Sequence, residues 1–199
     1  MSSKAMTALI ESLMKLPGVG AKTAARLAYH IVEMKNEDVE NLAAAIKNIK
    51  TETHSCAICF NTIDKSLDIC EICSSDKRDD KTICVVKDAK DLDAIERAGT
   101  FSGKYHVTGG LISPMAGVTQ EDIHLKELVE RVFKNDIHEV IIAFEPNVEG
   151  TATAHFIAKL LKPANVKVTK LAQGMSVGAD FAGTDSVTIA KAIENRVPI

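Results

Sequence analysis

The chain has 199 residues, 46% of them hydrophobic, and a formal net charge of −3. This composition is typical of a globular chain, and the acidic balance excludes a surface that is basic all over, so any DNA contact must be local. No apolar run approaches the length of a membrane span, and residues 1–7 lack a signal-peptide core. We therefore expect a cytoplasmic protein that does not associate with a membrane.

Apolar spacing in the N-terminal part predicts three helices. Two of them cover residues 8–16 and 21–34, and the third follows Asn36 as its cap, with Glu37 and Asp38 in its first turn. The side chains expected on the buried face of the third helix are Val39, Leu42, Ile46 and Ile49.

The first two helices are joined by the hairpin Leu16-Pro17-Gly18-Val19-Gly20. Two glycines allow a tight turn with positive φ and the close approach of another backbone. The backbone N–H groups that begin the second helix, together with nearby basic side chains, can contact phosphates. The alternative is a plain helical hairpin with a solvated basic face. The candidate DNA-contacting residues are Lys15, Gly18, Gly20, Lys22 and Arg26.

Two C-x-x-C pairs follow in a polar segment that is too short to form its own core. Such pairs bind two sides of a tetrahedral ion, and a closed four-thiolate site is structural, so we expect one structural Zn²⁺ per chain. A redox dithiol or two disulfides are the alternatives. The expected ligands are Cys56, Cys59, Cys70 and Cys73. The fifth cysteine, Cys84, lies in an apolar run and is expected to be a buried thiol.

The rest of the chain alternates between predicted strands and predicted helices, which is typical of a mostly parallel sheet covered by helices. The predicted strands cover residues 82–86, 104–107, 139–144 and 166–171. The predicted helices cover residues 91–98, 120–133, 151–161 and 184–195.

An acidic segment follows the third of these strands. Ligands gather at the carboxyl ends of parallel strands, and Glu145, Asn147 and Glu149 offer the oxygen atoms that Mg²⁺ prefers. The alternative is that Glu149 and its neighbours only stabilise the start of the next helix.

Three features occur in one order: the Leu16–Gly20 hairpin, the cysteine quartet and the segment Glu145-Pro146-Asn147-Val148-Glu149-Gly150. Together with the segments Tyr105–Pro114 and Val177–Asp180, they make the chain resemble the RecR family of bacterial recombination mediators over its full length. The resemblance implies an α+β multidomain chain. Its parts are a helix-hairpin-helix DNA-binding domain (residues 1–53), a four-cysteine zinc finger (54–79), a Toprim domain (80–175) and a helical C-terminal oligomerisation segment (176–199).

The resemblance also implies a function in recombinational DNA repair after DNA damage. Members of the family form rings, commonly homotetramers, which can encircle DNA, and dimers are also possible in solution. With RecO, and in many bacteria RecF, they help RecA to load on gapped or single-stranded DNA, without enzymatic activity. Such a protein binds DNA independently of sequence and works at the bacterial nucleoid.

One departure from the usual Toprim pattern bears on the chemistry. Lys87 stands at or beside the place of the first carboxylate, and Asn147 stands where a second acidic residue is common. A two-metal phosphoryl-transfer site is therefore poorly supported, and Mg²⁺ binding stays open. Glu145, Asn147 and Glu149 then form either a weak Mg²⁺ site or a contact for the partner protein. The alternative function is a Toprim-type, magnesium-dependent nuclease or primase-like enzyme.

Overall fold

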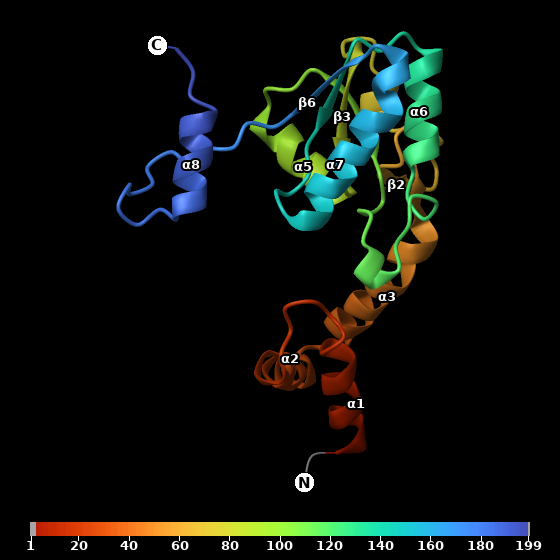
Figure 1. The fold of residues 1–199 in the computed structure, drawn as a ribbon. Helices are drawn as coiled ribbons and strands as arrows, with labels where there is room; N and C mark the ends of the chain where they lie inside the picture. The colour runs from red at the N-terminus through yellow and green to blue at the C-terminus, as the bar shows by residue number, and fades with distance from the viewer. Residues whose placement is uncertain (1–2, 199) are drawn as a thin grey trace. The chain divides into compact units, whose positions relative to one another are not determined.

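The computed structural model describes residues 3–198, and residues 1, 2 and 199, at the outer ends of the first and last predicted domains, lie outside the described residues. The chain divides between Thr53 and His54 into two compact units (Figure 1). We describe each unit by itself. No described helix has the length and apolarity that a membrane crossing requires.

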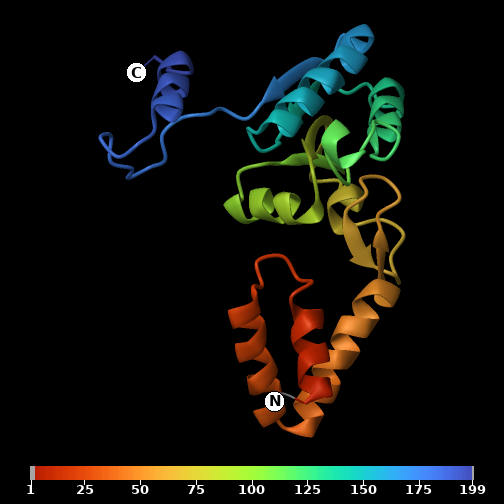
Figure 2. The same cartoon turned by 60° about the horizontal axis from the view of Figure 1, so that its bottom comes forward.

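The first unit consists of three helices: α1 (Lys4–Leu13), α2 (Ala21–Glu33) and α3 (Asn36–Glu52). Helix α1 begins four residues earlier than predicted because the Ser3 hydroxyl caps it, accepting a hydrogen bond of 3.1 Å from the Met6 N–H. Helices α1 and α2 lie side by side as a hairpin (Figure 2), and the small side chains of Ala24 and Ala28 are fully buried in this unit. The three predicted helices are thus present.

The prediction of a buried face on α3 is wrong for the chain by itself. Leu42, Ile46 and Ile49 are 42%, 65% and 58% exposed, and Val39 is only partly buried. The cap is also one residue earlier than predicted, because Lys35, not Asn36, is the residue with extended backbone before the helix. Apolar spacing identified the apolar face of α3 correctly, but spacing carries no information on what covers that face.

The second unit holds a small two-stranded sheet and a larger four-stranded sheet. The strands after α3 are β1 (Thr53–Ser55), β2 (Thr62–Asp64), β3 (Asp79–Val86), β4 (Gly103–Val107), β5 (Glu139–Ile142) and β6 (Lys167–Lys170). The helices are α4 (Glu71–Ser74), α5 (Ala89–Ala98), α6 (Leu125–Lys134), α7 (Val148–Leu161) and α8 (Ser186–Glu194), with single 3-10 turns at Pro114–Ala116 and Lys162–Ala164.

The larger sheet is fully parallel, with the strand order β4-β3-β5-β6. Alternate side chains of the central strand β3 point to opposite faces, and each face has its own core. Ile83 and Val85 pack in a cluster with residues of α6 and α7, whereas Cys84 and Val86 pack in a cluster with Leu92 of α5. The sheet is therefore covered on both faces, which is why its central strand is an uninterrupted apolar run.

The predicted alternation of strands and helices in residues 82–171 is confirmed, with shifts at some ends. Helix α6 begins at Leu125 instead of residue 120, because residues 120–124 form a turn. Helix α7 begins at Val148, three residues early, since Asn147 accepts a hydrogen bond of 2.7 Å from the Gly150 N–H and caps it. Cys84 is 2% exposed, which confirms the expected buried thiol, and this burial raises its pKa to about 12.

The C-terminal segment after β6 contains α8, which is capped by Asp185 through hydrogen bonds from the Val187 and Thr188 N–H groups. None of its described residues is buried. Apolar side chains in this segment are largely exposed: Val177, Phe181, Val187, Ile193 and Val197.

Candidate metal centre and nucleic-acid interface

The structure brings the four predicted ligands of the metal centre together. The Sγ atoms of Cys56, Cys59, Cys70 and Cys73 all lie within 4.8 Å of one another, and those of Cys59 and Cys70 are 3.6 Å apart. A tetrahedral ion with metal–sulfur distances of about 2.3 Å needs sulfur atoms about 3.8 Å apart. The cysteine quartet therefore has the spacing of a closed four-thiolate metal site. No other group of three or more His, Cys, Asp or Glu side chains is arranged to hold an ion in residues 3–198.

Local backbone geometry places these thiols. After Cys59 the chain turns back through Phe60, which has a left-handed φ of 63°, and the Phe60 N–H donates to the Cys56 carbonyl at 3.0 Å. Backbone N–H groups also point at sulfur: the Cys70 N–H donates to Cys56 Sγ and the Cys73 N–H donates to Cys70 Sγ, both at 3.3 Å. Each of these N–H groups stabilises the thiolate form of the sulfur that it faces, which is the form that binds metal.

Residues 54–79, which carry the four cysteines and are called the metal-binding segment from here on, are attached to the edge strand of the large sheet. The Val107 N–H of the edge strand β4 donates to the Cys59 carbonyl at 2.8 Å. Phe60 stacks on His124 with ring centroids 3.8 Å apart and contacts His106 edge-on. The segment thereby covers the Val107 end of a strand edge that would otherwise be open to other chains.

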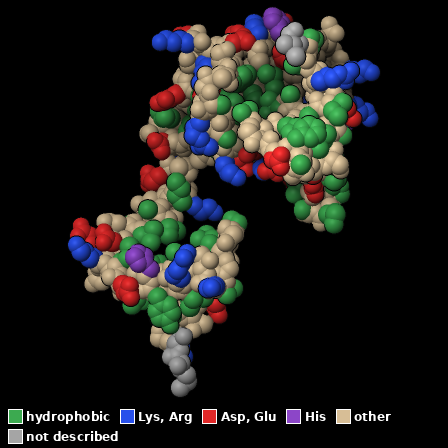
Figure 3. Space-filling view, turned by 90° about the vertical axis from the view of Figure 1, so that its left-hand side faces the viewer, with side chains coloured by type: hydrophobic (Ala, Val, Ile, Leu, Met, Phe, Trp, Pro, Cys, Tyr) green, Lys and Arg blue, Asp and Glu red, His purple; other side chains and the backbone are tan. Residues whose placement is uncertain are grey.

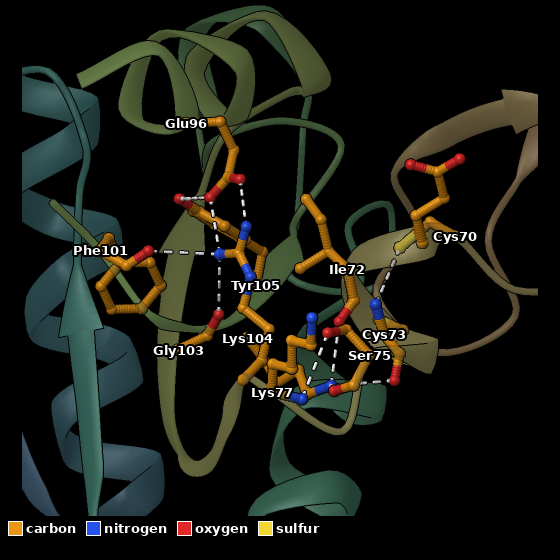
Figure 4. A network of polar contacts seen from close by, with 12 residues as sticks. Cys70, Ile72, Cys73, Ser75, Lys77, Glu96, Phe101, Gly103, Lys104 and Tyr105 are labelled. Carbon is orange, nitrogen blue, oxygen red and sulfur yellow. Dashed lines mark hydrogen bonds and ion pairs between the residues drawn. The ribbon is translucent and has the colours of Figure 1, made fainter. Parts of the chain in front are cut away.

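A second polar network, around Glu96, lies beside this attachment (Figure 4). The Arg78 guanidinium pairs with both carboxylate oxygens of Glu96 and also donates to the carbonyls of Phe101 and Gly103 at 3.2 and 3.4 Å. The Tyr105 hydroxyl donates to Glu96 Oε1 at 2.6 Å. Hydrogen bonding from Arg78 lowers the pKa of Glu96, so this carboxylate stays ionised. The network joins the chain after α4 to α5 and β4.

The predicted DNA-contacting residues lie on the hairpin between α1 and α2. Lys15, Lys22 and Arg26 are exposed, and the four-residue spacing of the last two puts them on one face of α2. Gly18 has the expected positive φ of 79°, but Gly20 does not, since it is the extended N-cap of α2 with φ −81°. The expectation of positive φ at both glycines is thus wrong for Gly20. A Cβ atom on either glycine would meet nothing within 4 Å, and no side chain caps α2. This helix start is therefore open to an external hydrogen-bond acceptor.

The carboxyl ends of β3 and β5 carry the residues of the predicted acidic site. These strands are neighbours, and the chain crosses to opposite sides of β3 to form β4 and β5, so this is the position where ligands of such sheets bind. Lys87 after β3 pairs with Glu145 after β5 at 3.4 Å and with Asp88 at 3.7 Å. Burial would lower the pKa of Lys87, but the charges of Asp91, Glu145 and Asp88 outweigh it and raise that pKa. An ammonium therefore occupies the centre of this edge.

The three oxygen donors predicted for Mg²⁺ are engaged to different degrees. The Asn147 amide oxygen accepts the capping bond from the Gly150 N–H, and its amide nitrogen donates to Glu145 Oε2 at 3.2 Å. Glu149 lies in the first turn of α7, where a carboxylate also favours the helix start. These side chains form an acidic edge next to Lys87, in which Glu145 and Asn147 are exposed and Glu149 is half-buried.

The family comparisons agree with this geometry. Residues 6–50 match the model described as RecR, helix-hairpin-helix, and residues 81–172 match the model of a Toprim domain. In this order, with the cysteine quartet between them, these domains form the RecR architecture. The chain therefore has the domain architecture of the RecR family. The predicted fold class is confirmed: a helix-hairpin-helix part, a four-cysteine metal-binding site and a Toprim domain with a parallel four-stranded sheet.

The RecR-type domains support a role in recombinational DNA repair, with DNA binding and interaction with partners. Within this architecture, the sequence reasoning missed the groups that attach the metal-binding segment to the Toprim sheet: Phe60, Arg78, Glu96, Lys104 and His124. Of these residues, only Phe60 could have been suspected from the local sequence, because it directly follows the ligand Cys59. The others come from distant segments, and their meeting depends on the tertiary fold.

A tight backbone turn fixes the acidic edge, and it requires glycine at position 150. A Cβ atom there would lie 2.1 Å from the Glu145 carbonyl oxygen and 3.1 Å from Asn147 Oδ1. We expect Gly150→Ala to lower the free energy of unfolding by about 1–3 kcal/mol or more, because backbone atoms must move apart. Thermal denaturation measures this loss. Gly174→Ala is the matched control, since its added Cβ would meet atoms only at 3.9 Å, and an equal loss in both variants would contradict the assignment.

Proposed function

We propose that this RecR-family chain is a non-enzymatic mediator of recombinational repair, which binds DNA independently of sequence and, with RecO and RecF, promotes RecA loading on gapped or single-stranded DNA. The observation that carries the proposal is the Lys87–Glu145 ion pair at the carboxyl edge of the Toprim sheet, in a chain whose first domain is the RecR hairpin. An ammonium at that edge occupies the position where a phosphoryl-transfer enzyme needs a carboxylate for its metal.

The hairpin supplies the DNA contact in this proposal. Lys15, Lys22 and Arg26 are exposed and reach phosphates, while the backbone around Gly18 and Gly20 is open to close approach. Contacts of this kind neutralise phosphates without reading base edges, so binding is independent of sequence. A chain with a net charge of −3 needs several copies of such a patch to hold a polyanion, which favours a ring.

Exposed apolar side chains support the proposed self-association into a ring-shaped homotetramer, with a dimer as a possible solution form. They occur on α3 of the first unit and along the C-terminal segment of the second, and Figure 3 shows hydrophobic side chains on the surface among the charged ones. We assign the first predicted domain to DNA binding and residues 176–199 to oligomerisation. Surfaces of this kind mark sites of protein interaction.

The remaining assignments follow from the same proposal. The ion of the cysteine quartet is one structural Zn²⁺ per chain, because four thiolates at tetrahedral spacing suit it and leave no open position for chemistry. The chain acts at the nucleoid in the bacterial cytoplasm, where RecA acts on DNA. Magnesium binding at Glu145, Asn147 and Glu149 is secondary to partner binding.

The experiment that tests the mediator function uses the full chain with RecO, RecA and single-stranded DNA coated with single-strand-binding protein. We expect the chain to accelerate RecA assembly and to leave labelled DNA uncut when Mg²⁺ is present. Magnesium-dependent cleavage, lost in Glu145→Gln, would overturn the proposal in favour of the nuclease or primase-like alternative.

The acidic edge is assigned to the basic partner RecO, and charge reversal tests this. We expect Glu149→Lys to weaken the RecO complex at least about tenfold, because like charges then face each other, while DNA binding is unchanged or slightly stronger. Calorimetry or fluorescence anisotropy measures both affinities. Glu127→Lys is the matched control, since Glu127 also lies in the first turn of a helix in the same unit. If the wild type and Glu149→Lys bind RecO with equal affinity, RecO does not bind at this edge.

A further inference from the structure

Lys104 of β4 is a buried cation without a carboxylate partner. Its residue is 7% exposed, and in residues 3–198 no Asp or Glu oxygen lies within 4.0 Å of its Nζ atom. Lysine is rarely buried unless its charge is compensated. The contrast with Arg78 in the same network is direct, because Arg78 has Glu96 as its counter-charge. Lys104 therefore needs another source of negative charge.

The contacts of Lys104 lead to the metal-binding segment. Its Nζ donates three hydrogen bonds, to the carbonyls of Ile72 at 2.9 Å, Cys73 at 3.0 Å and Ser75 at 2.7 Å (Figure 4). An ammonium has three N–H donors, so all of them are used on this one turn. One of the acceptors belongs to a predicted metal ligand, Cys73, and the other two flank it.

The metal centre, in contrast to Lys104, has an excess of negative charge. Four thiolates around one divalent ion leave a net charge of −2 in a site where three of the four cysteines are buried. Two backbone N–H groups, those of Cys70 and Cys73, donate to sulfur and offset part of this charge. Metal centres in proteins depend on such groups outside the ligand set.

We propose that Lys104 is the counter-ion of the four-cysteine metal centre and the residue that couples this centre to the Toprim sheet. The carbonyls of Ile72, Cys73 and Ser75 hold the ammonium on the turn that carries the ligand Cys73, and the charge of the centre compensates the buried cation. A cation at a helix end is a familiar arrangement, but α4 spans only four residues, and its partial dipole is weaker than a full negative charge. Lys104 is thus a positioning residue that acts on the metal through the thiolates.

The first test removes the charge and keeps the length of the side chain. We expect Lys104→Met to weaken metal binding about 10- to 100-fold in competition with a chromophoric chelator, the range seen for groups outside the ligand set. In the Co²⁺-loaded protein, the thiolate-to-cobalt charge-transfer band should move to longer wavelength, since the sulfur atoms lose a nearby positive charge. Lys104→Arg keeps the charge and should recover most of the affinity.

Arg78→Met is the matched control, because it removes a cation from the same network whose counter-charge is Glu96. It should destabilise the domain but leave the metal affinity and the cobalt band unchanged. Equal loss of metal affinity in Lys104→Met and Arg78→Met would overturn the proposal and leave Lys104 as a structural clamp only.

A second measurement uses the wild-type full chain and does not depend on the folding of a variant. Mass spectrometry after brief acylation reads the reactivity of each lysine before and after the metal is removed with a chelator. We expect Lys104 to be protected when metal is bound and to become reactive when it is removed, while Lys167, whose side chain is 69% exposed, reacts in both states. Protection of Lys104 that persists after chelation would contradict the proposal, because the carbonyls alone would then hold it.

Discussion

Replacing Cys73 with serine is expected to release the metal and to lower the thermal midpoint by about 10 °C or more. The binding free energy of a structural metal is folding free energy, and several kcal/mol of it correspond to this shift in a chain of about this size. The loss should spread beyond the metal-binding segment, since the Cys59 carbonyl, Phe60 and the carbonyls around Cys73 all hold that segment on the Toprim sheet. Metal analysis and thermal denaturation measure both effects, and Cys56→Ser should behave in the same way.

Cys84→Ser is the matched control for this substitution. Cys84 is as buried as the ligands Cys56, Cys59 and Cys70, with 2% exposure, but it lies on β3 outside the quartet. The control variant should keep one metal ion per chain and lose only the smaller free energy of burying a hydroxyl, about 1–3 kcal/mol. A Cys73→Ser protein that is free of metal and melts at the wild-type temperature would refute the structural role of the centre.

Reversing two charges on the hairpin, with Lys22→Glu and Arg26→Glu together, is expected to abolish detectable DNA binding while the metal and the oligomeric state remain. Both side chains lie on one face of α2 beside the open backbone of Gly18 and Gly20, and the reversal replaces attraction to phosphate by repulsion. If the chain forms a ring, every copy loses the same patch, and the effect multiplies. Electrophoretic shift and anisotropy measure binding, and light scattering measures the assembly.

Lys47→Glu with Lys50→Glu provides the matched control for the hairpin. These lysines are exposed on α3 of the same unit, and the net charge changes by the same amount. The control should bind DNA close to the wild-type level. Wild-type affinity should also fall with salt at a logarithmic slope of about −0.7 to −0.9 per phosphate neutralised. Equal loss in both double variants would mean that overall charge, and not the hairpin, governs binding.

The sequence by itself determined the elements and the local motifs of this protein. Helices α1 to α3 and the alternation of the Toprim part were predictable because apolar periodicity reports which side chains share a face. The cysteine quartet was predictable because a C-x-x-C pair places both sulfur atoms on one side of an ion within a single turn. The positive φ of Gly18 followed from the hairpin in the same way, and these features depend on residues that are close in the sequence.

The tertiary structure alone decided the contacts between distant residues. Lys87 and Glu145, which are 58 positions apart, meet because β3 and β5 became neighbours in the sheet. Lys104 reaches the carbonyl of Cys73, 31 positions away, because the metal-binding segment lies against the edge strand β4. The exposed face of α3 is the opposite case, since a pattern of apolar residues requires a partner surface without identifying it. Periodicity fixes the direction of a side chain relative to its own element, whereas strand order and packing fix which other element it meets.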